Sequence, residues 1–150
     1  MKKVKKTVSI EAPVSDVFRY VSNPESTVEW LPSMQQVNDI DVRDGGVGTN
    51  YRWTYTMAGM RFEGESVCTD CEFNRRLSTK SRGGIISTWD WFFEEEGGGT
   101  KMTIIIEYTV PVPVLGRIAE TLVLRQNRKE ADQAVENIKR KMEKNHTPAV

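Results

Sequence analysis

The stretch VLGRIAETLVLRQNRKEADQAVENIKRKMEK, residues 114–144, decides the fold because it contains no proline and only one glycine, Gly116. It predicts a helix of about thirty residues, roughly 45 Å long at 1.5 Å per residue. Its second half has a narrow apolar stripe, whereas the apolar residues of its first half cover more than half of the circumference. We expect the first half to contact two surfaces: a sheet, and either a cavity, a partner or a covering segment.

Most of the chain before this helix alternates between apolar and polar residues, which is the period of a half-buried strand. Seven segments are predicted strands: residues 3–11, 35–44, 49–57, 60–71, 75–82, 85–94 and 100–110. Between the first two, residues 13–22 and 24–31 each begin with a proline and predict short helices. The alternation slips within residues 35–44, so a β-bulge is expected there.

This order of elements predicts an α+β protein. Hairpin-length connections between consecutive strands indicate an antiparallel meander. A strongly curved antiparallel sheet of about six to seven strands, wrapped round the long C-terminal helix, would bury the apolar stripe of that helix. We expect residues 1–150 to form one such domain, with its helices on one face of the sheet.

Charge and composition exclude several classes of protein. The 21 basic and 21 acidic side chains give a formal net charge of zero, which provides no electrostatic footprint for nucleic acid. No apolar run approaches 18 residues, so no transmembrane segment is expected. The basic N-terminus is not followed by the apolar segment of a signal peptide. We therefore expect a cytoplasmic protein, either a monomer or a homodimer.

Histidine and cysteine chemistry has little support. The one histidine, His146, stands close to the C-terminus, which argues against a histidine-based hydrolase or zinc site. Cys68 and Cys71 form a C-x-x-C pattern, but a strand should point residues i and i+3 to opposite faces. No other cysteine is present to complete a metal site, so we predict two isolated reduced thiols, no metal and no cofactor.

The aromatic residues carry the main functional signal. Six large rings share the inward faces of two predicted strands: Tyr51, Trp53, Tyr55, Trp89, Trp91 and Phe93. Such rings are either plain core or the wall of a pocket, and the many polar tips favour a pocket. Further residues are predicted to line it with them: Trp30, Ile104, Ile106, Leu122 and Gln126.

Charged residues on the strands are expected to lie mostly outside this pocket. Alternation places four of them on the faces opposite the aromatic rings, where cross-strand ion pairs would form: Arg52, Glu63, Glu65 and Asp90. Asp70 shares its parity with Cys68 and is a candidate to face inward. If the protein is an enzyme, Tyr51, Tyr55 and Asp70 are the candidates for proton transfer.

An ordered set of short motifs resembles the START-like or helix-grip superfamily, which includes polyketide cyclases, dehydratases and lipid-transport proteins. The motifs are VSIEAP at residues 8–13, Val17-Phe18, Asn23-Pro24, Trp30-Leu31-Pro32, Gly48-Thr49, Arg75-Arg76-Leu77 and GTKMT at residues 99–103. The resemblance implies a cavity between the concave face of a sheet and the long helix. It also implies a small apolar or amphipathic ligand, but no single reaction, because carriers, sensors, cyclases and chaperone regulators share the fold.

Three functions follow from the residues and the resemblance. The first is a carrier or sensor that binds a small apolar, aromatic or lipid-like molecule in the cavity. The second is a cyclase- or dehydratase-like enzyme that acts on a polyketide-type substrate. The third is a protein-interaction module related to chaperone activators, whose cavity would be filled by its own side chains.

Overall fold

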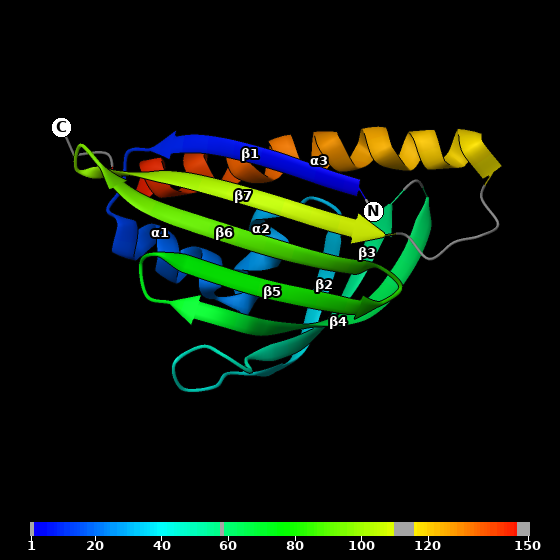
Figure 1. Ribbon diagram of the computed structural model, residues 1–150, viewed down its shortest axis with the longest axis horizontal. Coiled ribbons are helices and arrows are strands. Elements are labelled where there is room, and N and C mark those ends of the chain that lie inside the picture. Colours follow the sequence, from blue (N-terminus) through cyan, green and yellow to red (C-terminus); the bar gives the residue numbers. More distant parts are fainter. Residues whose placement is uncertain (1, 58, 110–115, 147–150) are drawn as a thin grey trace.

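The computed structural model describes residues 2–57, 59–109 and 116–146, without the side chains of residues 2, 116–124, 145 and 146 (Figure 1). The strands are β1 (Lys2–Ile10), β2 (Met34–Asp41), β3 (Asn50–Met57), β4 (Met60–Glu72), β5 (Arg76–Gly83), β6 (Ile86–Glu96) and β7 (Gly99–Thr109). The helices are α1 (Val14–Ser22), the 3-10 turn η1 (Pro24–Ser26), α2 (Thr27–Trp30) and α3 (Gly116–His146). Each element predicted from the sequence is therefore present, with small shifts at its ends.

The seven strands form one antiparallel sheet in the order β1-β7-β6-β5-β4-β3-β2. Only β1 is out of sequence order, and it pairs with β7 along its whole length, from Lys2 opposite Tyr108 to Ile10 opposite Thr100. The sheet curves, and α3 packs against β1 and α2 (Figure 1). This arrangement confirms the predicted α+β helix-grip fold.

Alternation along the strands builds the core on the concave face. In β7 the residues Met102, Ile104, Ile106 and Tyr108 are all buried, and the residues between them are more exposed. The second half of α3 contributes a narrow buried stripe, as predicted: Ala131, Ala134, Val135, Ile138 and Met142. The wide apolar half, which includes Leu122, lies outside the residues whose side chains are described.

β-Bulges interrupt the register at two strands, and only one of them was predicted. The expected irregularity in β2 is confirmed, with shifts between Met34 and Gln36 and between Asn38 and Asp41. A second shift occurs in β4: Cys68 is opposite Thr79, yet Asp70 is already opposite Ser78. The extra residue reverses the facing of every residue that follows it.

This bulge corrects two predictions for β4. Asp70 does not face inward with Cys68, because it lies on the convex side, 3.4 Å from Arg76. The two cysteines do not point to opposite faces, because Cys68 and Cys71 both line the interior cavity. The short polar segment gave no apolar periodicity from which the extra residue could be recognised.

The convex face carries cross-strand ion pairs at two of the four predicted residues, Glu65 and Asp90, whereas Glu63 pairs with Arg61 within β4. Glu65 and Arg82 pair across β4 and β5, and Arg76 lies 4.0 Å from Asp90 across β5 and β6. Both strand carboxylates thus lie away from the aromatic rings, as the alternation indicated. In the described part of the chain, no helix is long and apolar enough to span a membrane.

Candidate functional site

A cavity of about 710 Å³ lies between the concave face of the sheet and the helices. Strands β3 to β7 form one side of its wall. Residues of α1, α2 and α3 also contribute, and these helices lie across from the concave face of the sheet (Figure 1). Its volume falls within the range that small-molecule sites in proteins occupy, roughly 300–1,000 Å³. The aromatic residues therefore do not fill the interior, and a space large enough for a ligand remains.

Most residues predicted for the site lie along this cavity. Seven of them contribute to its wall: Trp30, Tyr51, Trp53, Tyr55, Trp89, Trp91 and Ile106. Phe93 and Ile104 point to the same side of the sheet but lie in the packed core, and Gln126 is not among the described residues of the wall. The side chain of Leu122 is outside the described residues. Ligand contact by any of these residues stays a prediction.

A cluster of indole rings forms one wall of the cavity. Trp30, from α2, meets Trp91 edge to face with ring centroids 5.4 Å apart, and Trp89 stacks on Trp91 at 6.0 Å. Phe93 stacks on the far side of Trp91 and contacts Phe18 of α1 at 5.3 Å. Phe18 thus fills the space beyond the cluster, which explains why Phe93 belongs to the core.

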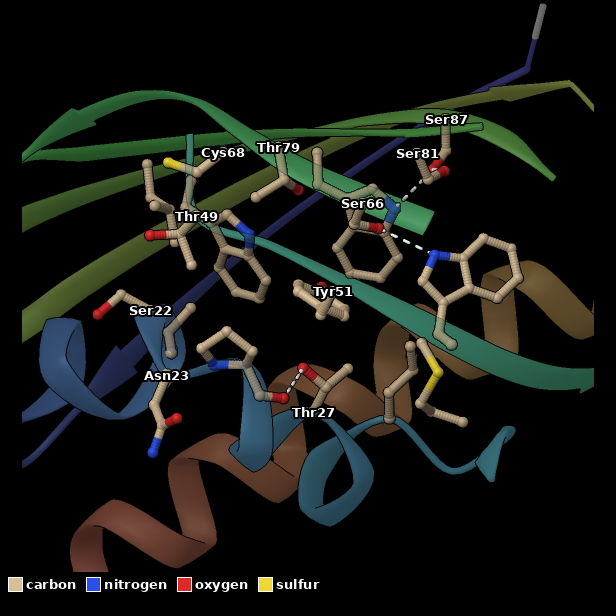
Figure 2. Close-up of a pocket in the computed structure, with 18 of the residues that line it drawn as sticks. Ser22, Asn23, Thr27, Thr49, Tyr51, Ser66, Cys68, Thr79, Ser81 and Ser87 are labelled. Carbon is tan, nitrogen blue, oxygen red and sulfur yellow. Dashed lines mark hydrogen bonds between the residues drawn. The ribbon is translucent and has the colours of Figure 1, made fainter. Parts of the chain in front are cut away.

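Serine hydroxyls accept hydrogen bonds from the indole N–H groups of three tryptophans that line the cavity. The indole N–H of Trp53 donates to Ser66 Oγ at 3.0 Å, a bond drawn in Figure 2. Trp30 donates to Ser26 Oγ at 3.1 Å, and Trp89 donates to Ser87 Oγ at 3.2 Å. These bonds hold the rings in fixed orientations, and they leave an apolar wall with neutral hydroxyls at defined places.

Tyr51 lies in the middle of the cavity, between Thr27 of α2 and Ser66 of β4 (Figure 2). Burial raises the pKa of its phenol, while hydrogen bonds with the hydroxyls of Ser66 and Thr27 partly oppose that rise. The phenol is therefore neutral across the physiological pH range. A neutral phenol at this place can donate a hydrogen bond to a bound molecule or accept one from it.

Tyr55 and Glu130 form a second polar site, and the sequence gave no sign of Glu130. The Glu130 carboxylate, on α3, accepts a hydrogen bond of 2.6 Å from the backbone N–H of Ser33. Burial is the main cause that raises the pKa of the Tyr55 phenol, and the charge of Glu130 raises it further. A hydrogen bond with Ser33 acts in the opposite direction and lowers this pKa. One carboxylate thus reaches the cavity from a charge-rich segment of α3.

The two cysteine thiols lie near one end of the cavity wall. Burial is the main cause that raises the pKa of Cys68 to about 11, and burial also raises the pKa of Cys71. Cys71 packs so closely on Gly46 that a Cβ at Gly46 would lie 2.6 Å from its sulfur. Both thiols are therefore protonated and unreactive near neutral pH.

Two arginines also contribute to the cavity wall, Arg43 and Arg19. Arg43, in the loop between β2 and β3, pairs with Asp41 at 2.7 Å, and its backbone N–H donates to Thr49. Arg19 of α1 is exposed and also contributes to the wall. Among the described residues, no group of three or more histidine, cysteine or acidic side chains could hold a metal ion.

The amino-acid sequence matches the model of one protein family over residues 1–143: polyketide cyclase / dehydrase and lipid transport. The chain belongs to this family. The match covers nearly the whole chain and agrees with the motifs and the fold. None of the curated proteins matches the chain.

Solved structures with the same fold cover the chain almost completely. The protein TTHA0849 from Thermus thermophilus is 19% identical, with a TM-score of 0.82 over 97% of this chain and 100% of that one. A START superfamily protein from Mycobacterium smegmatis is 17% identical, with a TM-score of 0.73 over 93% and 97% of the two chains. The di-domain ARO/CYC protein BexL of the BE-7585A biosynthetic pathway is 21% identical, with a TM-score of 0.73 over 98% of this chain and 51% of that one.

Proposed function

We propose that the protein binds a small, largely apolar or aromatic molecule in the cavity, as a carrier or sensor. The observation that carries this proposal is a space of about 710 Å³ lined by several aromatic rings, in which the indole N–H groups of Trp30, Trp53 and Trp89 are already hydrogen-bonded within the protein. A wall of this kind loses little on closing over an apolar ligand, because the indole donors of Trp30, Trp53 and Trp89 already have partners in the protein. Membership of a family that includes lipid-transport proteins supports the same conclusion.

The direct test is binding of the neutral fluorescent probe N-phenyl-1-naphthylamine. We expect its emission to rise on mixing with the protein, and the tryptophan emission to change, because Trp53 and Trp89 line the cavity. Native mass spectrometry of the freshly purified protein should show a copurified molecule. A protein that binds neither the probe nor any copurified molecule would contradict the proposal.

Adjacent residues of β5 offer a matched pair of variants. Thr79 lines the cavity, whereas Lys80 is exposed on the opposite face. Thr79→Phe should fill part of the space and weaken probe binding, while Lys80→Phe should leave binding unchanged. Thr79→Val keeps the size of the side chain and serves as the control for folding. Equal probe affinity in the two phenylalanine variants would place the probe outside the cavity and contradict the proposal.

A cyclase- or dehydratase-like activity is a second candidate, favoured by Tyr55 and Glu130 lying together in the cavity. A phenol beside a carboxylate can move a proton to or from a bound carbonyl compound. Asp70 takes no part in this candidate, because it lies on the convex face. Tyr55→Phe should then abolish turnover of a polyketide-type substrate while leaving its affinity unchanged.

A further inference from the structure

Glu130 is the one carboxylate among the described residues that line the cavity. It is half-buried, and the 2.6 Å bond from the backbone N–H of Ser33 holds it in place. The phenol of Tyr55 lies beside it. The carboxylate is therefore a fixed feature of the wall and not a mobile surface side chain.

No described lysine or arginine forms an ion pair with Glu130. The backbone of Arg43, one arginine of the cavity wall, bonds to Thr49, which is six residues before Tyr55 in the chain and directly precedes β3. At roughly 3.3 Å per strand residue, that separation is about 20 Å. A partly buried carboxylate is stabilised by a nearby positive charge, because burial removes part of its hydration.

The aromatic wall adds a second observation that favours a cation. The faces of tryptophan and tyrosine rings carry partial negative charge and attract ammonium groups within about 6 Å. Trp30, Trp89 and Tyr55 all contribute to the wall that Glu130 also lines. The carboxylate and the ring faces therefore disfavour an anion and favour a positively charged group in the same space.

We propose that the ligand carries a protonated amine or a similar organic cation, which docks at Glu130 while its apolar part occupies the aromatic cavity. This proposal rests on the proposed binding function and specifies the chemical class of the ligand. The cation supplies the positive charge that the described wall lacks near Glu130. The Ser33 N–H bond keeps the carboxylate oriented as the ligand enters.

Three ligands with the same ten-carbon chain test this proposal: decylamine, decanol and decanoate. Each is titrated at pH 7 into protein that holds N-phenyl-1-naphthylamine, and the loss of probe fluorescence gives its affinity. A charge-assisted bond to Glu130 should make decylamine bind about tenfold more tightly than decanol. Decanoate should bind most weakly, because its carboxylate would be repelled by Glu130.

Two variants of α3 assign the preference to one residue. Glu130→Gln should remove the advantage of decylamine and leave the affinity for decanol unchanged. Glu136→Gln is the matched control, because Glu136 is exposed on the same helix. Glu130→Asp keeps the charge and should retain part of the preference, which provides a second readout if the glutamine variant fails to fold. Probe binding itself reports that the cavity is intact in each variant.

The outcomes separate this proposal from the one on which it rests. If the wild-type protein does not bind the neutral probe, the binding function is overturned, and the amine preference falls with it. If the probe binds but decanol or decanoate equals or exceeds decylamine, the cationic ligand alone is overturned. The same conclusion follows if the folded Glu130→Gln protein keeps the preference for decylamine.

Discussion

The two faces of strands β3 to β6 are made from the same backbone and differ in chemistry. The convex face holds charged side chains in ion pairs such as Glu65–Arg82 and Asp70–Arg76. The concave face holds aromatic rings, neutral hydroxyls and protonated thiols, and the one carboxylate among the described residues of the cavity wall, Glu130, comes from α3. The charged side chains of these strands thus gather on the outer face, where they form ion pairs with one another.

The largest effect should come from Trp91 and its neighbour Phe92, which stand on opposite faces of β6. Trp91 is 2% exposed, whereas Phe92 is half-buried and carries Arg76 5.6 Å above its ring. We expect Trp91→Ala to lower the free energy of unfolding by about 3–5 kcal/mol and Phe92→Ala by about 1 kcal/mol. Urea denaturation measures both, and equal losses would contradict the difference between the faces.

A smaller loss is expected from Gly64, whose place on β4 keeps room for Trp53. A Cβ at Gly64 would lie 2.5 Å from the Trp53 ring and also collide with the Arg82 carbonyl oxygen. Gly64→Ala should therefore lower the free energy of unfolding by about 1–3 kcal/mol and blue- or red-shift the tryptophan emission. Glu63→Ala, at the exposed neighbouring position, should change neither quantity by a comparable amount. An unchanged emission in a stable Gly64→Ala protein would show that Trp53 does not pack on this strand.

The protonated thiol of Cys68 gives a test that depends on pH. Its pKa rises from an ordinary value of 9.0 to about 11, mainly through burial, so the thiol favours the folded state only while protonated. This contribution to stability is complete below about pH 9 and is lost as the pH rises towards 11. Cys68→Ala should flatten the decline of the urea midpoint over that range.

The rate of alkylation reports the ionisation of the Cys68 thiol at a lower pH. At pH 8 the thiolate fraction of Cys68 should be about a hundredfold smaller than that of an ordinary cysteine. In a Cys71→Ser background, iodoacetamide should therefore modify the folded protein slowly and the urea-unfolded protein quickly. Equal rates would mean that Cys68 is open to solvent and ionises normally.

The sequence allowed the strand faces to be predicted because a sheet with one buried side keeps a strict period of two. This period placed Trp53, Trp89 and Trp91 on the cavity wall. It failed at Cys68-Thr69-Asp70-Cys71, because four small or polar residues have no apolar pattern that would mark an inserted residue.

Two features of the site depended on tertiary packing that no local pattern records. Glu130 was missed because it lies in a charge-rich helix segment, and only its approach to Ser33 and Tyr55 distinguishes it from its exposed neighbours. Phe93 has the parity of the cavity wall, yet Phe18 of α1 occupies the space beside it. The side that a residue faces could be predicted, but what lies opposite it could not.

The smallest effect on stability should come from the ion pair Glu65–Arg82 on the convex face. This pair provides a comparison for Glu130, which carries the same charge in the cavity wall. The Arg82 side chain is 81% exposed, so water screens the pair, and Glu65→Gln should change the free energy of unfolding by at most about 0.5 kcal/mol. A double-mutant cycle with Arg82→Gln measures the coupling, and a value well above 1 kcal/mol would contradict this expectation. Glu130→Gln removes the same charge from the cavity wall, and the Gln side chain can still accept the Ser33 bond. Because that carboxylate has no described cationic partner, its loss should change which ligand binds, whereas the loss of Glu65 should leave ligand binding unchanged and stability nearly so.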